Sequence, residues 1–281
     1  MNLADINTLK SLLDKEGFSF KKSLGQNFLI DGTVCPKMAQ SSANENTGVL
    51  EIGPGVGVLT RELSQVAKRV VAIELDERLK KILPKTLGDL GNVEVIFGDA
   101  MKLDLKQLIK EKFSDCESVS VCANLPYYIT SPIIMMLLES HLPITNITVM
   151  VQKEAAQRLC AKVGTRNAGA VTVAVSYYAE TEILFDVDRS SFMPPPNVDS
   201  AVIKLNILPE APIKVKDEKK FFKLVKAAFA QRRKTLINTV SNSLNIPKND
   251  LREALQKLGI KETVRGEELT MEQFGTLSDF I

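Results

Sequence analysis

Histidine and paired cysteines are scarce in this 281-residue chain. It has one histidine, His141, and four cysteines that are scattered without a C-x-x-C pair. A zinc site needs a cluster of such ligands, so no metal is predicted. With a single histidine, the chain also has almost no residues for a mechanism in which a histidine activates a serine or cysteine nucleophile. The chemistry is therefore expected to run without an imidazole base.

Long apolar runs are also missing. No stretch approaches the roughly 18–20 apolar residues that cross a bilayer. The first five residues carry neither the basic segment nor the apolar segment of a secretory signal. We therefore expect a cytoplasmic protein with no membrane partner. Nothing in the sequence demands an oligomer, so a monomer is expected.

Excess charge is small overall but concentrated in one place. The net charge is only +2, yet residues 214–234 hold nine basic side chains against Asp217 and Glu218. Such a block indicates either nucleic-acid binding or a solvated helix face. Charge alone does not decide between them.

The hydrophobic pattern predicts two domains. Short β-branched runs alternate with amphipathic stretches, such as 58–67 and 76–83, which is typical of a parallel sheet with crossover helices. Strong helical periodicity replaces this rhythm after Pro209–Pro212. We expect an α/β domain over 1–209 and an all-helical domain over 210–281. The predicted sheet has seven strands, the last antiparallel: 49–52, 70–74, 93–97, 119–123, 147–151, 183–187 and 201–207.

A glycine-rich turn follows the first predicted strand. The sequence E-I-G-P-G-V-G at 51–57 leads directly into a helical stretch. Glycines there allow a sharp turn and the close approach of a nucleotide-type ligand. A dinucleotide fingerprint would need a glycine at Val58, so the spacing favours S-adenosylmethionine over NAD. A glycine turn that holds no cofactor remains an alternative.

Two carboxylates end the next two strands. Glu74 would accept hydrogen bonds from both ribose hydroxyls of a cofactor, as it could in an NAD enzyme as well. Asp99 would accept from an adenine amino group beside an apolar floor. An alternative for Asp99 is a helix N-cap.

The turn Asn124-Leu125-Pro126-Tyr127 closes the fourth strand. An adenine N6 is a weak nucleophile because its lone pair is delocalised into the ring. The Asn124 amide oxygen and the carbonyl of Leu125 or Pro126 could accept the two N6 hydrogens, weaken that conjugation and aim the nitrogen. Tyr127 offers a ring for stacking the base, which is worth roughly 1–3 kcal/mol. The proton can leave to water after transfer, so no ionisable base is needed.

These motifs resemble the ribosomal RNA adenine dimethyltransferases of the bacterial KsgA/RsmA type. The resemblance rests on the glycine turn, the N-L-P-Y turn, F-M-P-P-P-N-V-D-S at 192–200 and K-K-S-L-G-Q-N-F-L at 21–29, and it spans nearly the whole chain. It implies a Rossmann-like, seven-stranded S-adenosylmethionine-dependent methyltransferase fold with a small all-helical C-terminal domain. The segment at 21–29 would fold over the cofactor. Phe192 would lie across the target adenine from Tyr127.

The residue patterns and the resemblance together give the expected site residues, and the RNA-binding set comes from the basic block. The expected catalytic set is Asn124, Leu125, Pro126, Tyr127 and Phe192. The expected cofactor set is Asn27, Leu29, Gly53, Gly55, Glu74, Leu75, Asp99, Ala100 and Asn124. The basic side chains expected to bind RNA are Lys223, Lys226, Arg232, Arg233 and Lys234.

The implied substrate is 16S rRNA in the small ribosomal subunit, dimethylated at N6 of two adjacent adenosines in a hairpin loop near its 3′ end. The related Erm type modifies one large-subunit adenosine. Leu125, Gln231–Leu236 and Arg265–Leu269 resemble the small-subunit branch. Gly266, Tyr128 and Ala168 depart from the usual residues of that branch.

Two alternatives to a dedicated methyltransferase remain. The chain could act mainly by binding an immature subunit, with methylation secondary. An NAD-dependent oxidoreductase would need a glycine at Val58 and a histidine for hydride transfer, which the sequence lacks.

Overall fold

The computed structural model describes residues 3–18 and 27–281, which form two compact units. The first unit contains the described residues up to Ala156 together with Glu182–Ile207. The second contains Gln157–Thr181 together with Leu208–Ile281. No helix in the described ranges is long and apolar enough to cross a membrane.

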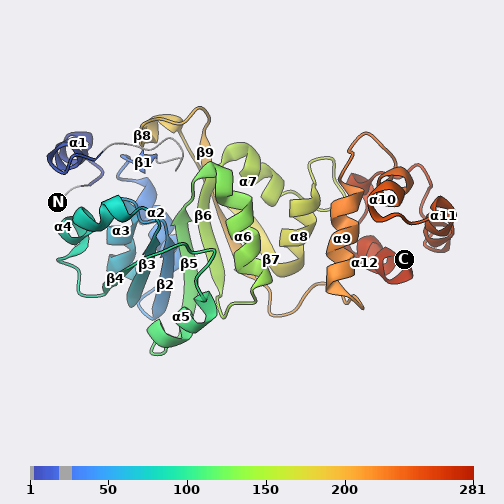
Figure 1. Cartoon of the computed structure of the whole chain (residues 1–281), viewed down its shortest axis with the longest axis horizontal. Coiled ribbons are helices and arrows are strands. Elements are labelled where there is room, and N and C mark those ends of the chain that lie inside the picture. The colour runs from blue at the N-terminus through green and yellow to red at the C-terminus, as the bar shows by residue number, and fades with distance from the viewer. Residues whose placement is uncertain (1–2, 19–26) are drawn as a thin grey trace. The chain divides into compact units, whose positions relative to one another are not determined.

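A seven-stranded sheet with the order β4-β3-β2-β5-β6-β9-β7 forms the centre of the first unit (Figure 1). The first five strands in this order, β4, β3, β2, β5 and β6, pair in parallel. β9 pairs with β6 in the antiparallel sense. All six residues of β2 are buried, as expected for an inner strand of a parallel sheet. The predicted strands are confirmed with small shifts at their ends: β2 (Thr47–Ile52), β3 (Arg69–Glu74), β4 (Val93–Phe97), β5 (Ser118–Asn124), β6 (Asn146–Gln152), β7 (Ala179–Val187) and β9 (Ser200–Ile207).

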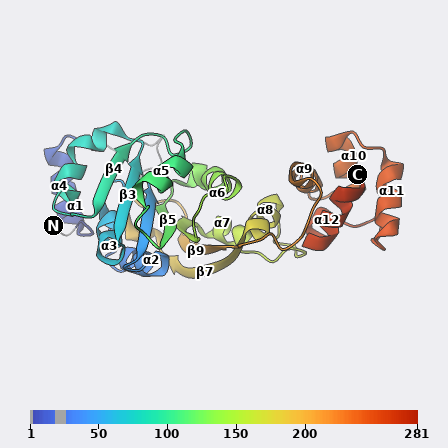
Figure 2. The same cartoon turned by 90° about the horizontal axis from the view of Figure 1, so that it is seen from below.

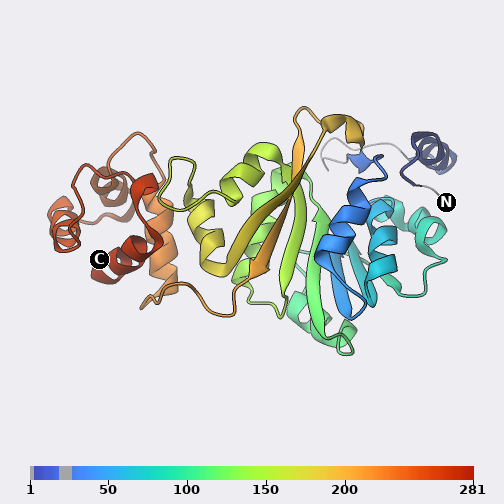
Figure 3. The same cartoon turned by 180° about the vertical axis from the view of Figure 1, so that it is seen from behind.

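Helices cover both faces of this sheet. Figure 2 shows α2 (Val34–Ser42) and α3 (Val58–Val66) on one face, with α5 (Leu105–Lys112) and α6 (Thr130–Glu139) on the other. In the view from behind in Figure 3, α2 is the mid-blue helix on the near face of the sheet and α3 is the lighter blue helix beside it, whereas the dark blue helix beside the N-terminus is α1. Their buried side chains form a core with Val49, Val70 and Cys122 of the sheet.

Short helices and 3₁₀ turns complete the first unit. The predicted helix over 76–83 is instead a 3₁₀ turn at Glu77–Lys81 followed by α4 (Leu83–Leu87), with Pro84 near the start of α4. The remaining elements of this unit are α1 (Ile6–Lys15), η3 (Tyr127–Ile129) and η4 (Arg189–Ser191), with α7 (Lys153–Leu159) running into the second unit.

A two-stranded sheet that the sequence analysis did not predict joins distant segments of the first unit. β1 (Phe28–Leu29) pairs in the antiparallel sense with β8 (Phe192–Met193), and Leu29 lies opposite Phe192. Both side chains are almost fully buried. This pairing holds the end of the N-terminal segment beside the edge of the main sheet.

The second unit is helical. It contains α8 (Ala170–Tyr178), α9 (Glu218–Ala228), α10 (Leu236–Leu244), α11 (Lys248–Lys257), η5 (Gly266–Glu268) and α12 (Met271–Phe280). The Asp217 carboxylate caps α9 by accepting a hydrogen bond from the Lys220 backbone N–H at 3.0 Å.

Aromatic packing binds α8 to the C-terminal helices. The Tyr178 ring stacks on Phe222 at 5.6 Å between centroids, and Tyr177 lies 5.3 Å from Phe221. The Tyr178 hydroxyl also donates to the Glu218 carboxylate. Residues 157–181 therefore pack with the helices that follow 208, whereas the predicted division had one boundary at 209/210. Whether 1–209 and 210–281 fold as independent domains stays a prediction.

Phe221→Ala should lower the free energy of unfolding of the second unit by about 3–5 kcal/mol, because a fully buried phenylalanine would be replaced by a cavity. Urea unfolding, with hydrogen exchange of α8 and α9, measures the change. Phe280→Ala is the control, since that ring is 50% exposed and its loss should cost less than about 1 kcal/mol. Equal losses from both substitutions would contradict the packing described.

Candidate cofactor and substrate site

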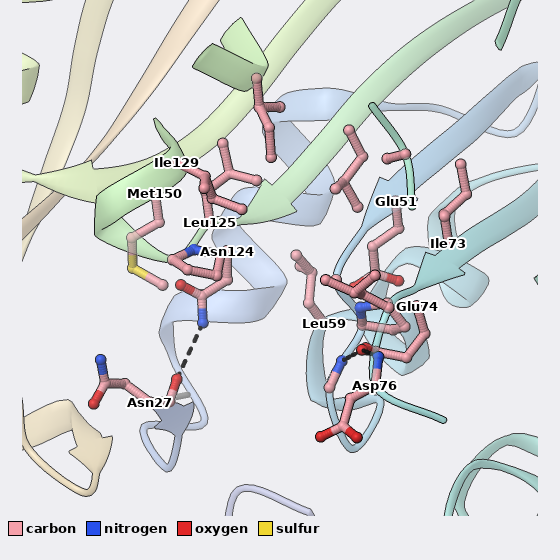
Figure 4. A pocket seen from close by; sticks show the side chains of 18 of the residues that line it. Asn27, Glu51, Leu59, Ile73, Glu74, Asp76, Asn124, Leu125, Ile129 and Met150 are labelled. Carbon is pink, nitrogen blue, oxygen red and sulfur yellow. Dashed lines mark hydrogen bonds between the residues drawn. The ribbon is translucent and has the colours of Figure 1, made fainter. Parts of the chain in front are cut away.

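A cavity of about 270 Å³ opens at the carboxyl edge of the parallel strands. Figure 4 shows side chains from β2, β3 and β5 that line it. Every residue predicted for the cofactor and catalytic sets lines this one cavity: Asn27, Leu29, Gly53, Gly55, Glu74, Leu75, Asp99, Ala100, Asn124, Leu125, Pro126, Tyr127 and Phe192. Residues spread over more than 160 positions are thus brought together by the topology of the sheet.

The glycine turn connects β2 to α3. Gly53, Gly55 and Gly57 all have positive φ values, of 73°, 59° and 94°. A Cβ on Gly55 would lie 3.0 Å from the Phe28 ring, and one on Gly57 would lie 2.7 Å from Leu87. Glycine is thus required by conformation at all three positions, and by space at Gly55 and Gly57 as well.

Glu74 ties this turn to the end of β3. Its Oε2 accepts a hydrogen bond from the Gly55 N–H at 3.1 Å, and its Oε1 accepts from the Asp76 N–H at 2.7 Å. Each carboxylate oxygen can still accept a second hydrogen bond, which a ribose hydroxyl could supply. Burial raises the pKa of Glu74, and the two backbone N–H groups oppose this rise.

The turn after β5 places an amide at the other side of the cavity. The Asn124 Nδ2 donates to the Asn27 carbonyl at 3.5 Å, a long contact that orients the amide oxygen away from Asn27 (Figure 4). The Pro126 carbonyl accepts from the Ile129 N–H at 3.1 Å and from the Thr130 hydroxyl at 3.3 Å. The sequence left the carbonyls of Leu125 and Pro126 open as acceptors of an N6 hydrogen. The Pro126 carbonyl already accepts two hydrogen bonds at the start of α6.

Two aromatic side chains lie near this turn. The Tyr127 hydroxyl hydrogen-bonds the Ser200 hydroxyl at 2.7 Å, and burial raises its pKa. Phe192 is only 3% exposed and packs in the core with Leu29 and Met38. Both rings face one cavity, but their position relative to a bound base stays a prediction.

Comparison with known proteins identifies the family. A family model described as ribosomal RNA adenine dimethylase matches residues 17–281. The chain belongs to the ribosomal RNA adenine dimethylase family. The resemblance predicted from the motifs is thereby confirmed.

Relatives of this family are similar over almost the full chain. Ribosomal RNA small subunit methyltransferase A of Geobacillus sp. (strain WCH70) is 47% identical over 99% of this chain and 97% of its own length. The protein of the same name from Bacillus cereus (strain B4264) is 48% identical over the same shares.

Two solved structures of RNA-modifying or adenosine-modifying enzymes are similar to the chain. A dimethyladenosine transferase from Plasmodium falciparum has a TM-score of 0.73 and 29% identity, covering 89% of this chain and 95% of that one. The 23S rRNA methyltransferase ErmE has a TM-score of 0.68 and 27% identity, covering 90% of this chain and 99% of that one. The Rossmann-like methyltransferase fold is therefore confirmed, and an NAD-dependent oxidoreductase is excluded.

S-adenosylmethionine is the cofactor of this family, and the cavity fits it. A Cβ at Gly53 would have nothing within 4 Å, so the turn leaves open space on its cavity side. The Glu74 carboxylate supplies two acceptors there, and apolar side chains such as Ile73 and Ala100 supply a floor. These donors and surfaces match a nucleoside with ribose hydroxyls and a flat base.

Asp99 lines the cavity and makes a tight turn. Its Oδ1 accepts from the Met101 N–H at 3.0 Å, and its other oxygen lies 3.5 Å from the Lys102 ammonium. The N-cap of α5 is Asp104, so the alternative that Asp99 caps the following helix is wrong.

Glu51 is a cavity residue that the sequence analysis did not include in the site. It is the next-to-last residue of β2, is 1% exposed, and its Oε2 has no hydrogen-bond partner among the described residues. Burial raises its pKa to about 8, the Glu74 carboxylate adds to the rise, and Thr60 opposes it. Its place two residues before Gly53 was the signal that could have identified it.

The residues predicted to bind RNA all lie in the second unit, and none of them is among the residues that line the cavity. Lys223, Lys226, Arg233 and Lys234 are exposed. Arg232 is also exposed, but its guanidinium donates to the Arg166 carbonyl at 2.7 Å and pairs with Glu267 at 3.3 Å. Arg232 therefore also holds the loop before α8 against the turn after α9.

The three departures from the usual sequence have different surroundings. A Cβ on Gly266 would lie 2.7 Å from the Ala228 carbonyl oxygen. An alanine at this position would therefore require the backbone at 228 or 266 to move. Tyr128 lines the cavity with 56% exposure, and Ala168 is buried. Among the described residues, no cluster of metal ligands occurs.

Glu51→Gln should stabilise the cofactor-free protein at pH 8 but not at pH 4.5. In the folded chain the carboxyl stays protonated until about pH 8, whereas in the unfolded chain it ionises near 4.5. Its contribution to the free energy of unfolding therefore falls as pH rises between these values, and glutamine removes this loss, which is on the order of 4 kcal/mol at pH 8. Denaturant unfolding at both pH values measures the difference.

The control is Glu45→Gln, which changes an exposed glutamate in the same way. Its stability relative to the parent should not depend on pH. A Glu51→Gln protein whose relative stability is constant from pH 4.5 to 8 would contradict a protonated Glu51.

Proposed function

We propose that this protein transfers methyl groups from S-adenosylmethionine to N6 of two adjacent adenosines in the 3′-terminal hairpin loop of 16S rRNA, as a step in small-subunit biogenesis. The observation that carries the proposal is the Asn124–Tyr127 turn, which faces the same cavity as the glycine turn and Glu74. The names of the relatives with 47–48% identity support a small-subunit substrate.

When bound, S-adenosylmethionine supplies an electrophilic methyl group on its sulfonium. The Asn124 amide oxygen and the Leu125 carbonyl would accept the two N6 hydrogens, since the Pro126 carbonyl already accepts two hydrogen bonds. Both contacts draw the nitrogen lone pair out of conjugation and aim it along one direction. The transfer would break the methyl–sulfur bond, leave the cofactor as its neutral thioether and form the N6–methyl bond. The nitrogen, positively charged after the transfer, would then lose one proton to water.

Tyr127 and Phe192 would hold the flipped base. An enzyme that modifies a base must take it out of its stack, and a ring face compensates part of that cost. The Tyr127–Ser200 hydrogen bond fixes the tyrosine ring. The second transfer starts from a monomethylated nitrogen, so this clamp must accept one added methyl group.

Asn124→Ala should lower kcat for methyl transfer to unmodified small subunits by about 100-fold, because the target nitrogen loses its orientation. The cofactor Kd should change far less, since Glu74 and the glycine turn remain. Single-turnover assays and cofactor titration separate the two effects.

Asn146→Ala is the matched control, because it removes the same amide from the opposite end of the neighbouring strand β6. It should retain activity. An Asn124→Ala protein that turns over within about threefold of the parent would exclude Asn124 as the N6 acceptor.

Selection of one hairpin requires a wider surface than a pocket for one base, and we assign it to Lys223, Lys226, Arg232, Arg233 and Lys234. Because Arg232 also makes internal contacts, the test leaves it in place. The double variant Arg233→Glu and Lys234→Glu should weaken subunit binding and reduce the slope of log affinity against log salt by roughly one per lost phosphate contact. Cofactor binding should not change.

The control replaces Lys248 and Lys261, two exposed cations elsewhere in the same unit, by glutamate. It changes the net charge equally and should leave the slope closer to that of the parent. If both double variants have the parent's affinity and slope, the basic block is a solvated surface without a role in RNA binding.

A further inference from the structure

The buried carboxyl of Glu51 has no role in the contacts described above. It extends from the end of β2 toward the cavity beside Glu74 (Figure 4). Its Oε2 is buried and, like the hydroxyl of the neighbouring Thr60, makes no hydrogen bond within the described part of the chain. A buried polar atom without a partner costs free energy, so it indicates a partner that arrives from elsewhere.

No described neighbour of Glu51 offers a positive charge. The Glu74 carboxylate faces it from β3, the Cys35 and Cys122 thiols from α2 and β5, and the Thr60 hydroxyl from α3. Burial raises the pKa of both thiols, so they remain neutral. Glu74 is the one group among them that can carry a charge near neutral pH, and it repels an ionised Glu51.

The other described residues that line the cavity include no cationic side chain either. Its described lining contains four carboxyl side chains, Glu51, Glu74, Asp76 and Asp99, and no lysine, arginine or histidine. Asp76 pairs with Arg78 and Asp99 lies 3.5 Å from the Lys102 ammonium. Among the described residues, Glu51 and Glu74 are thus the lining carboxyls without a cationic partner, and they favour a ligand with positive charge. S-adenosylmethionine carries two positive groups, a sulfonium and an α-ammonium.

We propose that Glu51 loses its proton when the cofactor binds, so that cofactor binding is coupled to the release of one proton to solvent. The inference rests on the cofactor assignment and not on the RNA substrate. The α-ammonium is the partner that completes the site, because it can donate a hydrogen bond to Oε2 and a sulfonium cannot. The carboxylate and the ammonium then form a buried pair in place of a neutral acid.

The direction of the pH effect follows from the free state. With a pKa of about 8, the Glu51 carboxyl is protonated in most cofactor-free molecules at pH 7. A ligand that needs the ionised form therefore binds more tightly as pH rises, by about tenfold per pH unit between pH 6 and 7. Measurements stay below pH 7 because the amino group of the ligand itself titrates near pH 8.

Calorimetric titration in buffers of different ionisation enthalpy counts the protons directly. The parent protein, without RNA, should release close to one proton with S-adenosylmethionine at pH 6.5. S-adenosylhomocysteine should do the same, because it retains the ammonium. Methylthioadenosine lacks the amino-acid part and should bind without proton release.

Glu51→Gln should bind S-adenosylmethionine without releasing a proton, and its affinity should be flat between pH 6 and 7. Asp99→Asn is the matched control, since it changes a carboxyl to an amide elsewhere in the cavity. It should weaken binding but keep both the proton release and the pH slope.

Two results would overturn the proposal: a parent protein that releases no proton, or a Glu51→Gln protein that releases as many as the parent. The second would assign the proton to Glu74. If Glu51→Gln does not fold, the parent's response to methylthioadenosine decides, because proton release with that ligand also contradicts an ammonium partner. Loss of rRNA methylation with normal proton release would reject the proposed substrate alone.

Discussion

The Glu74 carboxylate is the point on which the cofactor side of the cavity depends. It receives backbone N–H groups from the glycine turn and from Asp76, at 3.1 and 2.7 Å. These bonds hold the ends of β2 and β3 in a fixed relation at an edge where ladder pairing stops. Because the start of α3 follows the turn by a few residues, the same carboxylate also positions that helix. A ribose would meet acceptors that the fold has already oriented, which reduces the entropy lost on binding.

The opposite side of the cavity depends on a contact between the N-terminal segment and β5. The Asn27 carbonyl orients the Asn124 amide, and the next two residues pair with Phe192 and Met193. The segment around Asn27, far from β5 in sequence, therefore sets the direction of the Asn124 side chain, which would accept a hydrogen from N6. The cofactor side and the base side thus share one cavity but depend on separate backbone contacts. Substitutions on the cofactor side should change cofactor binding, and substitutions on the base side should change methyl transfer.

Local patterns predicted the sheet and most of the cavity. Buried parallel strands are continuous β-branched runs, and their carboxyl ends must meet at one edge, so Glu74, Asp99 and Asn124 could be placed together from spacing alone. The pairing of Leu29 with Phe192 and the packing of 157–181 with α9 are long-range contacts without a periodic signal. The engagement of the Pro126 carbonyl and of Arg232 depends on side-chain and backbone geometry that no pattern encodes. Glu51 was visible as a motif residue, but its burial and its unpaired oxygen were not.

If this cavity methylates N6 of adenosine in small-subunit rRNA, the position of the transferred methyl group in the RNA will show it. The direct test is to incubate the protein with labelled S-adenosylmethionine and separately with unmodified small subunits, large subunits or duplex DNA, and to map the modified base by mass spectrometry. We expect N6,N6-dimethyladenosine at two adjacent positions near the 3′ end of 16S rRNA, and no modification of the other two substrates. Label in a large-subunit adenosine, or on another atom or base, would contradict it.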